Sequence, residues 1–214
     1  SSEEYISSLI HFLKKKIDLT KEVKILDIGC GRGMIISTLS KKYLMNNLPL
    51  GIDIIKHKDT ASRIRFIKIN ALNYLSKTKE KFDVILFKQS IHFFKFTEIE
   101  KLLKYSKKNL TPKGKIIILA LYPKKNYWPL FKIFKLRLIK SLEKDRKILN
   151  LIKSSFKKYK INYFTFKVKM TRNIYIQMIK NRFNSCLLNL SSEEISTGIE
   201  EIRRKYKKKL IFLD

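Results

Sequence analysis

The chain has 214 residues, of which 44% are hydrophobic, and this suits one domain with a sizeable core. No run of about 18 uncharged apolar residues is present, which argues against a membrane-crossing segment. The first residues show no signal-peptide pattern. We therefore expect a cytoplasmic protein in which Cys30 and Cys186 are reduced thiols.

The formal net charge of +30 raises the question of nucleic-acid binding. Of the 48 basic residues 39 are Lys, whereas the Arg guanidinium is the better reader of bases and phosphates. The composition is rich in Lys and Ile and poor in Ala and Pro, as expected from an AT-rich genome, and the lysines are spread along the whole chain. Compositional drift and selected affinity for a polyanion or anionic membrane both remain open. Either predicts weak, salt-sensitive, non-specific binding to polyanions.

The predicted elements begin with an amphipathic helix, because apolar side chains recur at helical spacing over residues 5–13. The apolar run 23–26 predicts a strand, and residues 34–44 predict a helix. Between them lies a glycine-rich segment, Asp27-Ile28-Gly29-Cys30-Gly31-Arg32-Gly33. Its glycines permit positive φ and a close approach of backbone to ligand. The loop also presents backbone N–H groups at a helix N-terminus, where an anionic group is stabilised.

Three more strands are predicted at residues 48–54, 64–69 and 82–87. The first ends at Asp53, about 20 residues beyond the glycine loop, where a βαβ unit places a carboxylate on ribose hydroxyls. The second leads into a short helix at residues 70–75.

A helix at 97–110 and an almost continuously apolar strand at 115–121 follow, the latter typical of a strand buried on both faces of a parallel sheet. Residues 128–156 predict a long helix. The remaining predictions are a strand at 161–168, helices at 170–183 and 191–207, and a last strand at 210–213.

In their order and spacing, the elements from about residue 23 to 121 resemble the class I S-adenosylmethionine-dependent methyltransferases. The resemblance implies an α/β fold, with a Rossmann-like, seven-stranded, mostly parallel sheet and helices on both faces. Helical insertions would follow strand five and separate strands six and seven. It further implies one methyltransferase domain over 1–214, with a cofactor-binding half at 1–121 and a substrate-side half at 122–214. The methyl donor would be S-adenosyl-L-methionine and the product S-adenosyl-L-homocysteine.

The resemblance also assigns roles to single residues. Asp27 and the loop glycines would hold the methionine end of the cofactor, Asp53 its ribose and Ile54 its adenine. The Asn70 amide oxygen would meet the adenine ring, unless it simply caps the following helix. The full set implied to bind the cofactor is Asp27, Gly29, Cys30, Gly31, Gly33, Asp53, Ile54, Asn70, Ala71 (through its N–H) and Lys88 (through its carbonyl).

The segment 88–94, Lys88-Gln89-Ser90-Ile91-His92-Phe93-Phe94, resembles small-molecule methyltransferases of the type 11 domain group, near the trans-aconitate and juvenile-hormone-acid branch. Trp is common in that group where this chain has Phe93, so the exact substrate stays open. Gln89 and His92 would orient a carboxylate acceptor, which is already ionised at neutral pH and needs no catalytic base. The alternative for His92 is packing beneath the next helix.

Tyr122 and Trp128, in the insertion after strand five, would cover the mouth of the site. The alternatives for this insertion are a basic amphipathic helix at a membrane surface and a helix packed on the edge of the sheet. We therefore predict O-methylation of a small carboxylic acid. An RNA or tRNA methyltransferase that uses the lysine-rich surface is the first alternative, and a cofactor-binding partner subunit without transferase activity is the second. The sequence has no Cys and His spacing typical of a metal site, so no metal is predicted. It indicates neither the pathway nor the oligomeric state.

Overall fold

The computed structural model describes residues 2–121, 129–207 and 210–213. Within these ranges, none of the helices combines the length and the apolar character needed to cross a membrane.

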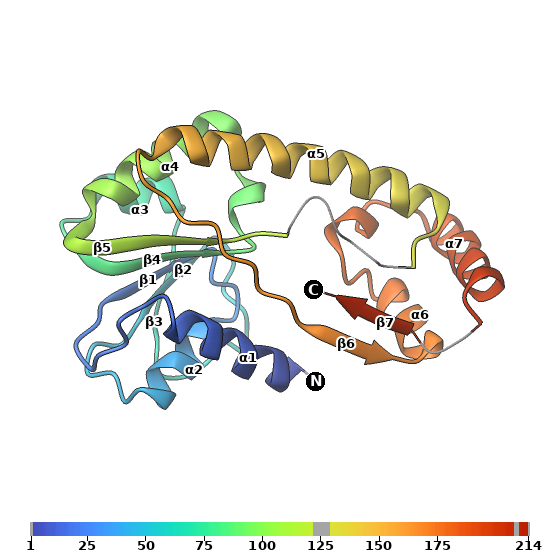
Figure 1. Cartoon of the computed structure of the whole chain (residues 1–214), viewed down its shortest axis with the longest axis horizontal. Helices are drawn as coiled ribbons and strands as arrows, with labels where there is room; N and C mark the ends of the chain where they lie inside the picture. Colours follow the sequence, from blue (N-terminus) through green and yellow to red (C-terminus); the bar gives the residue numbers. More distant parts are fainter. Residues whose placement is uncertain (1, 122–128, 208–209, 214) are drawn as a thin grey trace. The chain divides into compact units, whose positions relative to one another are not determined.

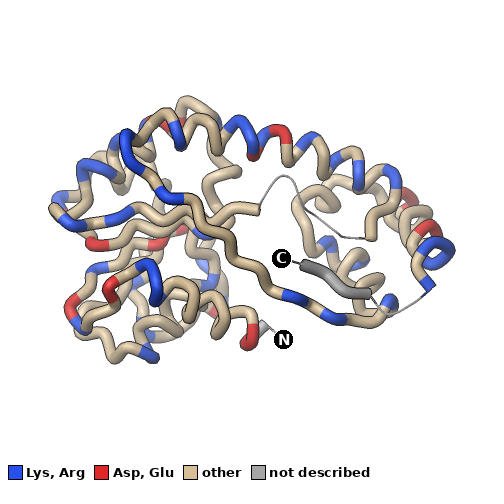
Figure 2. Tube along the Cα trace, in the orientation of Figure 1, with Lys and Arg blue, Asp and Glu red and all other residues tan. Residues whose placement is uncertain are grey.

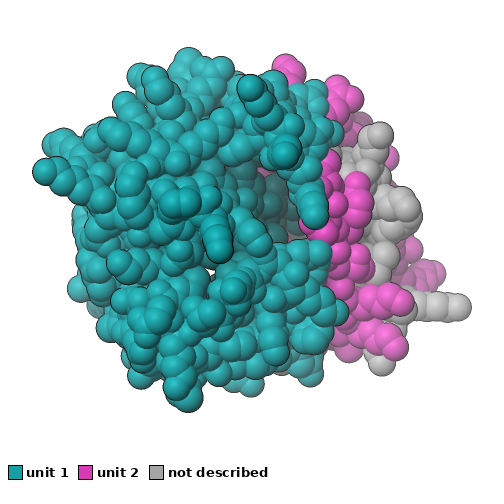
Figure 3. All heavy atoms as spheres, turned by 60° about the vertical axis from the view of Figure 1, so that its left-hand side comes forward, with its two compact units in different colours: residues 1–121, 150–160 teal, residues 122–149, 161–214 magenta. Residues whose placement is uncertain are grey.

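The chain forms two compact units, distinguished by colour in Figure 3. Unit 1 contains Ser1–Leu121 and Asn150–Lys160, and unit 2 contains Tyr122–Leu149 and Ile161–Asp214. The glycine loop and all residues predicted to bind the cofactor belong to unit 1. That the whole chain is one methyltransferase domain stays a prediction.

Unit 1 is built on a five-stranded parallel sheet (Figure 1). Its strands lie in the order β3-β2-β1-β4-β5, so the order reverses where β1 lies beside β4. In open α/β sheets, ligands bind outside the carboxyl ends of the strands at such a reversal. The bounds are β1 Ile25–Ile28, β2 Leu50–Asp53, β3 Arg65–Lys68, β4 Phe82–Lys88 and β5 Leu110–Leu119.

Helices cover both faces of this sheet. Figure 1 shows α1 (Ser2–Lys14) and α2 (Met34–Lys42) on one face, and α3 (Ala71–Lys77) and α4 (Phe96–Lys108) on the other. All four β1 residues are buried, as a strand between two helix layers requires. A short 3-10 helix, η1 (Ile91–Phe93), connects β4 to α4.

The long helix α5 (Lys132–Ser155) begins in unit 2, and its last residues belong to unit 1. In unit 1, Lys107 of α4 donates a hydrogen bond to the Ser155 carbonyl, and its Nζ lies 4.3 Å from the centre of the Phe156 ring. A cation over an aromatic face is attracted by the ring electrons. These contacts hold the segment 150–160 against α4.

Unit 2 contains β6 (Lys167–Met170), α6 (Arg172–Lys180), the 3-10 helix η2 (Ser185–Leu187), α7 (Ser192–Lys205) and β7 (Leu210–Leu213). A buried apolar cluster packs the first part of α5 against α6 and α7. Its members are Phe131, Phe134, Tyr175, Ile176, Ile179, Leu187, Leu190, Ile195, Ile199 and Ile202.

The prediction of one seven-stranded sheet is wrong for the described residues. β6 and β7 pair with each other, antiparallel, in a separate two-stranded sheet of unit 2. The sequence of β6 explains this, because exposed lysines alternate with half-buried Val168 and Met170. Such alternation suits a ribbon with one solvated face rather than a parallel strand buried on both faces. The strand predicted at 161–168 is found at 167–170, and β5 begins at residue 110 rather than 115.

Candidate active site

The glycine loop leaves the end of β1 with three residues at positive φ: Gly29 at 70°, Gly31 at 55° and Gly33 at 71°. An L side chain is strained in this region of backbone space. At Gly29 a Cβ would also lie 2.5 Å from the Cβ of Ser90. At Gly31 nothing lies within 4 Å of the place a Cβ would take. At Gly33 a Cβ would lie 2.4 Å from Cδ1 of Ile64. The loop therefore packs tightly at both ends and leaves open space above its middle.

Ser90 holds the glycine loop against the end of β4. It is buried, and its hydroxyl donates a 2.5 Å hydrogen bond to the Ile28 carbonyl. No role for Ser90 was predicted from the sequence. A small residue directly after β4 is a signal that could have indicated a close approach to the loop.

Asp53, at the end of β2, is tied to the same loop. Its Oδ2 accepts a 2.8 Å hydrogen bond from the Gly31 N–H, and its Oδ1 accepts one of 3.1 Å from Ile55 N–H. The structure thus brings together the loop and the acid predicted to hold the ribose.

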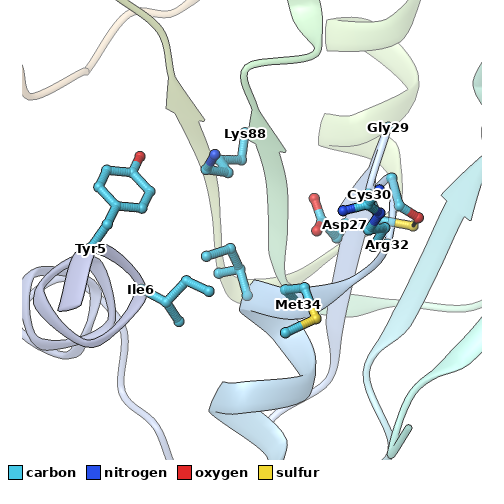
Figure 4. Close-up of a pocket in the computed structure, with 10 residues that line it drawn as sticks. Tyr5, Ile6, Asp27, Gly29, Cys30, Arg32, Met34 and Lys88 are labelled. Carbon is cyan, nitrogen blue, oxygen red and sulfur yellow. Dashed lines mark hydrogen bonds between the residues drawn. The ribbon is translucent and has the colours of Figure 1, made fainter. Parts of the chain in front are cut away.

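A cavity of about 330 Å³ lies above the loop, within unit 1 (Figure 4). One wall comes from Tyr5 and Ile6 of α1, which the sequence analysis did not place at the site. Met34 and Ile35 contribute from the start of α2. The other lining residues are Asp27, Gly29, Cys30, Gly31, Arg32 and Lys88.

Asp27 is the buried acid of this cavity, with only 3% of its surface exposed. Burial raises its pKa from 3.8 to about 7, the Lys88 charge opposes that rise, and the Asp53 charge adds to it. No hydrogen-bond partner reaches Asp27 Oδ1 from the described part of the chain. A buried polar atom of this kind is normally satisfied by a partner, so its position on the cavity wall marks a place for a hydrogen-bond donor from a ligand.

Lys88, the last residue of β4, sends its side chain to the cavity wall. Its Nζ lies 5.4 Å from the centre of the Tyr5 ring. Figure 4 shows Tyr5, Lys88 and Asp27 around the same space. From the sequence, only the Lys88 main-chain carbonyl was expected at the site.

Cys30 lies in the loop but is poorly suited to nucleophilic chemistry. Burial, together with the charges of Asp27 and Asp53, raises the pKa of its thiol to about 12. Its sulfur packs close to Gly51 of β2, where an added Cβ would lie 2.7 Å from Sγ. Gly51 is therefore a second position that the sequence analysis missed.

The residues predicted to meet adenine do not line this cavity. Ile54 follows β2 and is 63% exposed, so its apolar side chain is open to contact. Asn70 caps α3, because its Oδ1 accepts hydrogen bonds from Leu72 N–H and Asn73 N–H at 2.9 and 3.3 Å. The side-chain oxygen of Asn70 is therefore occupied in capping α3, which is the alternative role predicted for it from the sequence. Ala71 is buried at the start of α3.

Gln89 and His92 follow β4 and are half-buried, but neither lines the cavity. Gln89 has a positive φ of 54°, and its N–H donates a 2.9 Å hydrogen bond to the Leu119 carbonyl of β5. The His92 ring lies 4.2 Å from the ring of Phe93, which is 72% exposed. Tyr122 and Trp128, predicted to cover the mouth, lie outside the described residues. The carboxylate-orienting roles of Gln89 and His92 stay predictions.

Solved structures of three proteins share this fold. A protein of Anabaena variabilis, named as a methyltransferase from an antibiotic biosynthesis pathway, is 13% identical, with a TM-score of 0.64 over 96% of this chain and 95% of its own. A methyltransferase of Archaeoglobus fulgidus is 15% identical, with a TM-score of 0.55 over 100% and 92%. One of Geobacter sulfurreducens, solved with S-adenosyl-L-homocysteine, is 15% identical, with a TM-score of 0.53 over 98% and 89%.

Among curated proteins no significant match is found. The sequence profile of the methyltransferase domain family, in contrast, matches residues 19–175, which include the glycine loop, Asp53 and the end of β4. The chain therefore belongs to the methyltransferase domain family and is a class I S-adenosylmethionine-dependent methyltransferase.

Proposed function

We propose that this enzyme methylates a small molecule, and that its acceptor atom is a carboxylate oxygen. The positive φ of Gln89, at the carboxyl edge of the sheet, carries the acceptor part of the proposal. The cavity above the glycine loop supports the donor part, because Tyr5 and Ile6 of α1 close one side of it and leave about 330 Å³. A volume near the lower end of the range of ligand pockets suits part of a small cofactor.

The residues present fit the cofactor. The unsatisfied Asp27 Oδ1 would accept a hydrogen bond from its amino group. The free space above Gly31 admits a ligand close to the backbone, as only glycine allows at this φ. Asp53 would bind the ribose hydroxyls, and exposed Ile54 would lie against the adenine.

The cofactor supplies a methyl group on a positively charged sulfur, which is already activated for transfer. The task left to the chain is to position the acceptor and exclude water, because in-line geometry supplies much of the rate. A carboxylate acceptor is ionised at neutral pH. The reaction therefore needs no general base.

Gln89 and His92 are the residues proposed to orient that carboxylate. Both follow β4, at the carboxyl edge of the sheet where ligands bind in α/β folds. Gln89 keeps a positive φ, which is unusual for a residue with a side chain and is often found at functional sites. The hydrogen bond from its N–H to Leu119 supports this conformation.

Methylation of RNA is the competing function, favoured by the net charge of +30. Figure 2 shows Lys and Arg distributed along the helices and connecting segments of both units. A dispersed charge predicts general attraction to polyanions rather than recognition of one RNA. For this reason the small-molecule proposal is preferred.

The test is a transfer assay with radiolabelled S-adenosyl-L-methionine, run against a panel of organic acids and against bulk RNA. We expect base-labile product from one or more acids, as for a methyl ester. Gln89→Ala and His92→Ala should lower turnover of that acid while S-adenosyl-L-homocysteine binds as before. His11→Ala, at an exposed position of α1, is the control. Transfer to RNA with none to the acids would replace the proposal.

A further inference from the structure

Two side chains of opposite charge line the cavity, and they come from neighbouring strands. Asp27 lies on β1 and Lys88 ends β4, which pairs with β1 in parallel register. Asp27 is buried and Lys88 is half-buried, so water screens their charges less than it would on an open surface. The two charges also interact, since Lys88 lowers the pKa of the acid. The cavity thus presents one anionic group, Asp27, and two cationic groups, Lys88 and Arg32. Arg32 is exposed and forms an ion pair with Asp59 at 3.0 Å, so the less exposed Lys88 is the better screened from water of the two cations.

The aromatic ring of Tyr5 helps to fix the position of the cation. Lys88 Nζ lies 5.4 Å from the ring centre, within the range where an ammonium is attracted to an aromatic face. Tyr5 belongs to α1, and Lys88 belongs to the sheet that α1 covers. The helix therefore restrains a flexible side chain that would otherwise lose conformational freedom on binding a ligand.

We infer that Lys88 Nζ, held beside Tyr5, is a carboxylate-binding group that receives the α-carboxylate of the cofactor's amino-acid end. The inference rests on the proposed cofactor site, where Asp27 receives the α-amino group. An amino acid carries one ammonium and one carboxylate, and the cavity wall carries one carboxylate and one ammonium. Charge-assisted hydrogen bonds of this kind are roughly twice as strong as neutral ones.

This role differs from the one that the family resemblance implies for Lys88 at the end of the fourth strand. There only the main-chain carbonyl takes part, and any residue type would serve. If the side chain binds the carboxylate, the residue type matters, and a neutral replacement of similar length loses affinity only for ligands that have a carboxylate. Lys88 would then be a positioning residue, because it fixes the end of the cofactor remote from the methyl group.

The experiment measures calorimetric dissociation constants of Lys88→Met for three probes. These are S-adenosyl-L-homocysteine, its decarboxylated analogue, and methylthioadenosine, which lacks both amino and carboxylate groups. We expect Lys88→Met to raise the dissociation constant of S-adenosyl-L-homocysteine about tenfold or more, as for loss of one charged hydrogen bond. The dissociation constants of the decarboxylated analogue and of methylthioadenosine should stay within about twofold. Lys88→Arg should retain most of the affinity. Lys101→Met, on the exposed face of α4, is the matched control.

Asp27→Asn completes the comparison. It should weaken the binding of S-adenosyl-L-homocysteine and of the decarboxylated analogue to the same extent, since both keep the amino group. The binding of methylthioadenosine should not change. Unchanged methylthioadenosine binding also shows that each variant is folded.

Equal weakening of all three probes by Lys88→Met would overturn the inference and make Lys88 a structural support. Unchanged cofactor binding with a raised KM for the acceptor acid would overturn it as well, and would assign Lys88 to the acceptor. Wild-type protein that binds the decarboxylated analogue and S-adenosyl-L-homocysteine equally, but methylthioadenosine more weakly, would contradict the inference alone. Binding of no probe by the wild type would overturn the cofactor site and the inference with it.

Discussion

The N–H of Gly31 donates a 2.8 Å hydrogen bond to Oδ2 of Asp53, which lies 22 residues further along the chain. This bond joins the middle of the glycine loop to the end of β2. Two regions proposed to touch different parts of the cofactor are therefore fixed relative to each other within unit 1. Such preorganisation lowers the ordering cost of binding.

Replacing Asp53 should weaken cofactor binding and loosen the loop together. Asp53→Ala removes the acceptor for Gly31 and for the ribose, and hydrogen bonds to a charged group contribute about 1.5–3 kcal/mol. We expect the dissociation constant of S-adenosyl-L-homocysteine to rise about 10- to 100-fold by calorimetry. Glu80→Ala, which removes an exposed ion pair with Arg65, should change it little. An unchanged constant in Asp53→Ala would show that Asp53 does not serve the ribose.

Gly29 and Gly31 should respond differently to alanine. Both have positive φ, which costs an L residue about 1–2 kcal/mol. Only at Gly29 does the new Cβ also meet the Cβ of Ser90, at 2.5 Å. Gly29→Ala should therefore lower the free energy of unfolding by more than Gly31→Ala, by at least about 1 kcal/mol. Urea denaturation of both variants provides the measurement, and equal losses would argue against a tight Gly29–Ser90 contact.

Asp27 should make stability fall as pH rises from about 4 to 7. Its folded pKa is raised to about 7 from 3.8, chiefly by burial, so the folded state binds the proton more tightly than the unfolded state. The contribution is complete below pH 3.8 and is lost as pH rises through the folded value. The slope is at most about 1.4 kcal/mol per pH unit.

Asp27→Asn stays neutral and should remove this slope. Urea denaturation at several pH values between 4 and 7 compares it with the wild type and with exposed Asp59→Asn. Parallel pH profiles for wild type and Asp27→Asn would refute the raised pKa.

Unit 2 should be sensitive to a methyl group at Gly198 of α7. Alanine is the better helix former by about 1 kcal/mol. However, a Cβ at this position would lie 2.4 Å from the Phe131 ring, which is fully buried. Overpacking of this kind costs about 1–3 kcal/mol, so Gly198→Ala should lower the melting temperature. Ser196→Ala, on the exposed face of the same helix, should not, and adding Phe131→Leu to Gly198→Ala should restore part of the loss.

Binding to unrelated RNAs should be similar in strength and should fade steeply with salt. The reason is that lysines spread along the chain neutralise phosphates without reading bases. Filter binding with several RNAs at rising salt measures this. Tight retention of one RNA at physiological salt, with the others excluded, would contradict the prediction and favour an RNA substrate.

The local features of the cofactor half were predictable from sequence because each depends on neighbouring residues. Glycines at fixed positions after an apolar run indicate a strand, a loop with positive φ and then a helix. The structure has β1, the glycine loop and α2 in this order at the predicted positions. Asn70 before a short apolar helix is typical of an N-cap, and it caps α3. The spacing from the loop to Asp53 placed the acid beside the glycines, because a parallel crossover returns to the same edge of the sheet.

The sequence by itself therefore determined the first four strands, the loop and the family, since these follow from short-range patterns. Only the tertiary structure decided what faces the cavity. Tyr5 precedes Lys88 by more than 80 residues, and nothing local to either indicates their contact. Likewise β6 and β7 pair with each other rather than extending the parallel sheet. Pairing of strands and meeting of side chains depend on which surfaces bury together, and that is a property of the whole folded unit rather than of a segment.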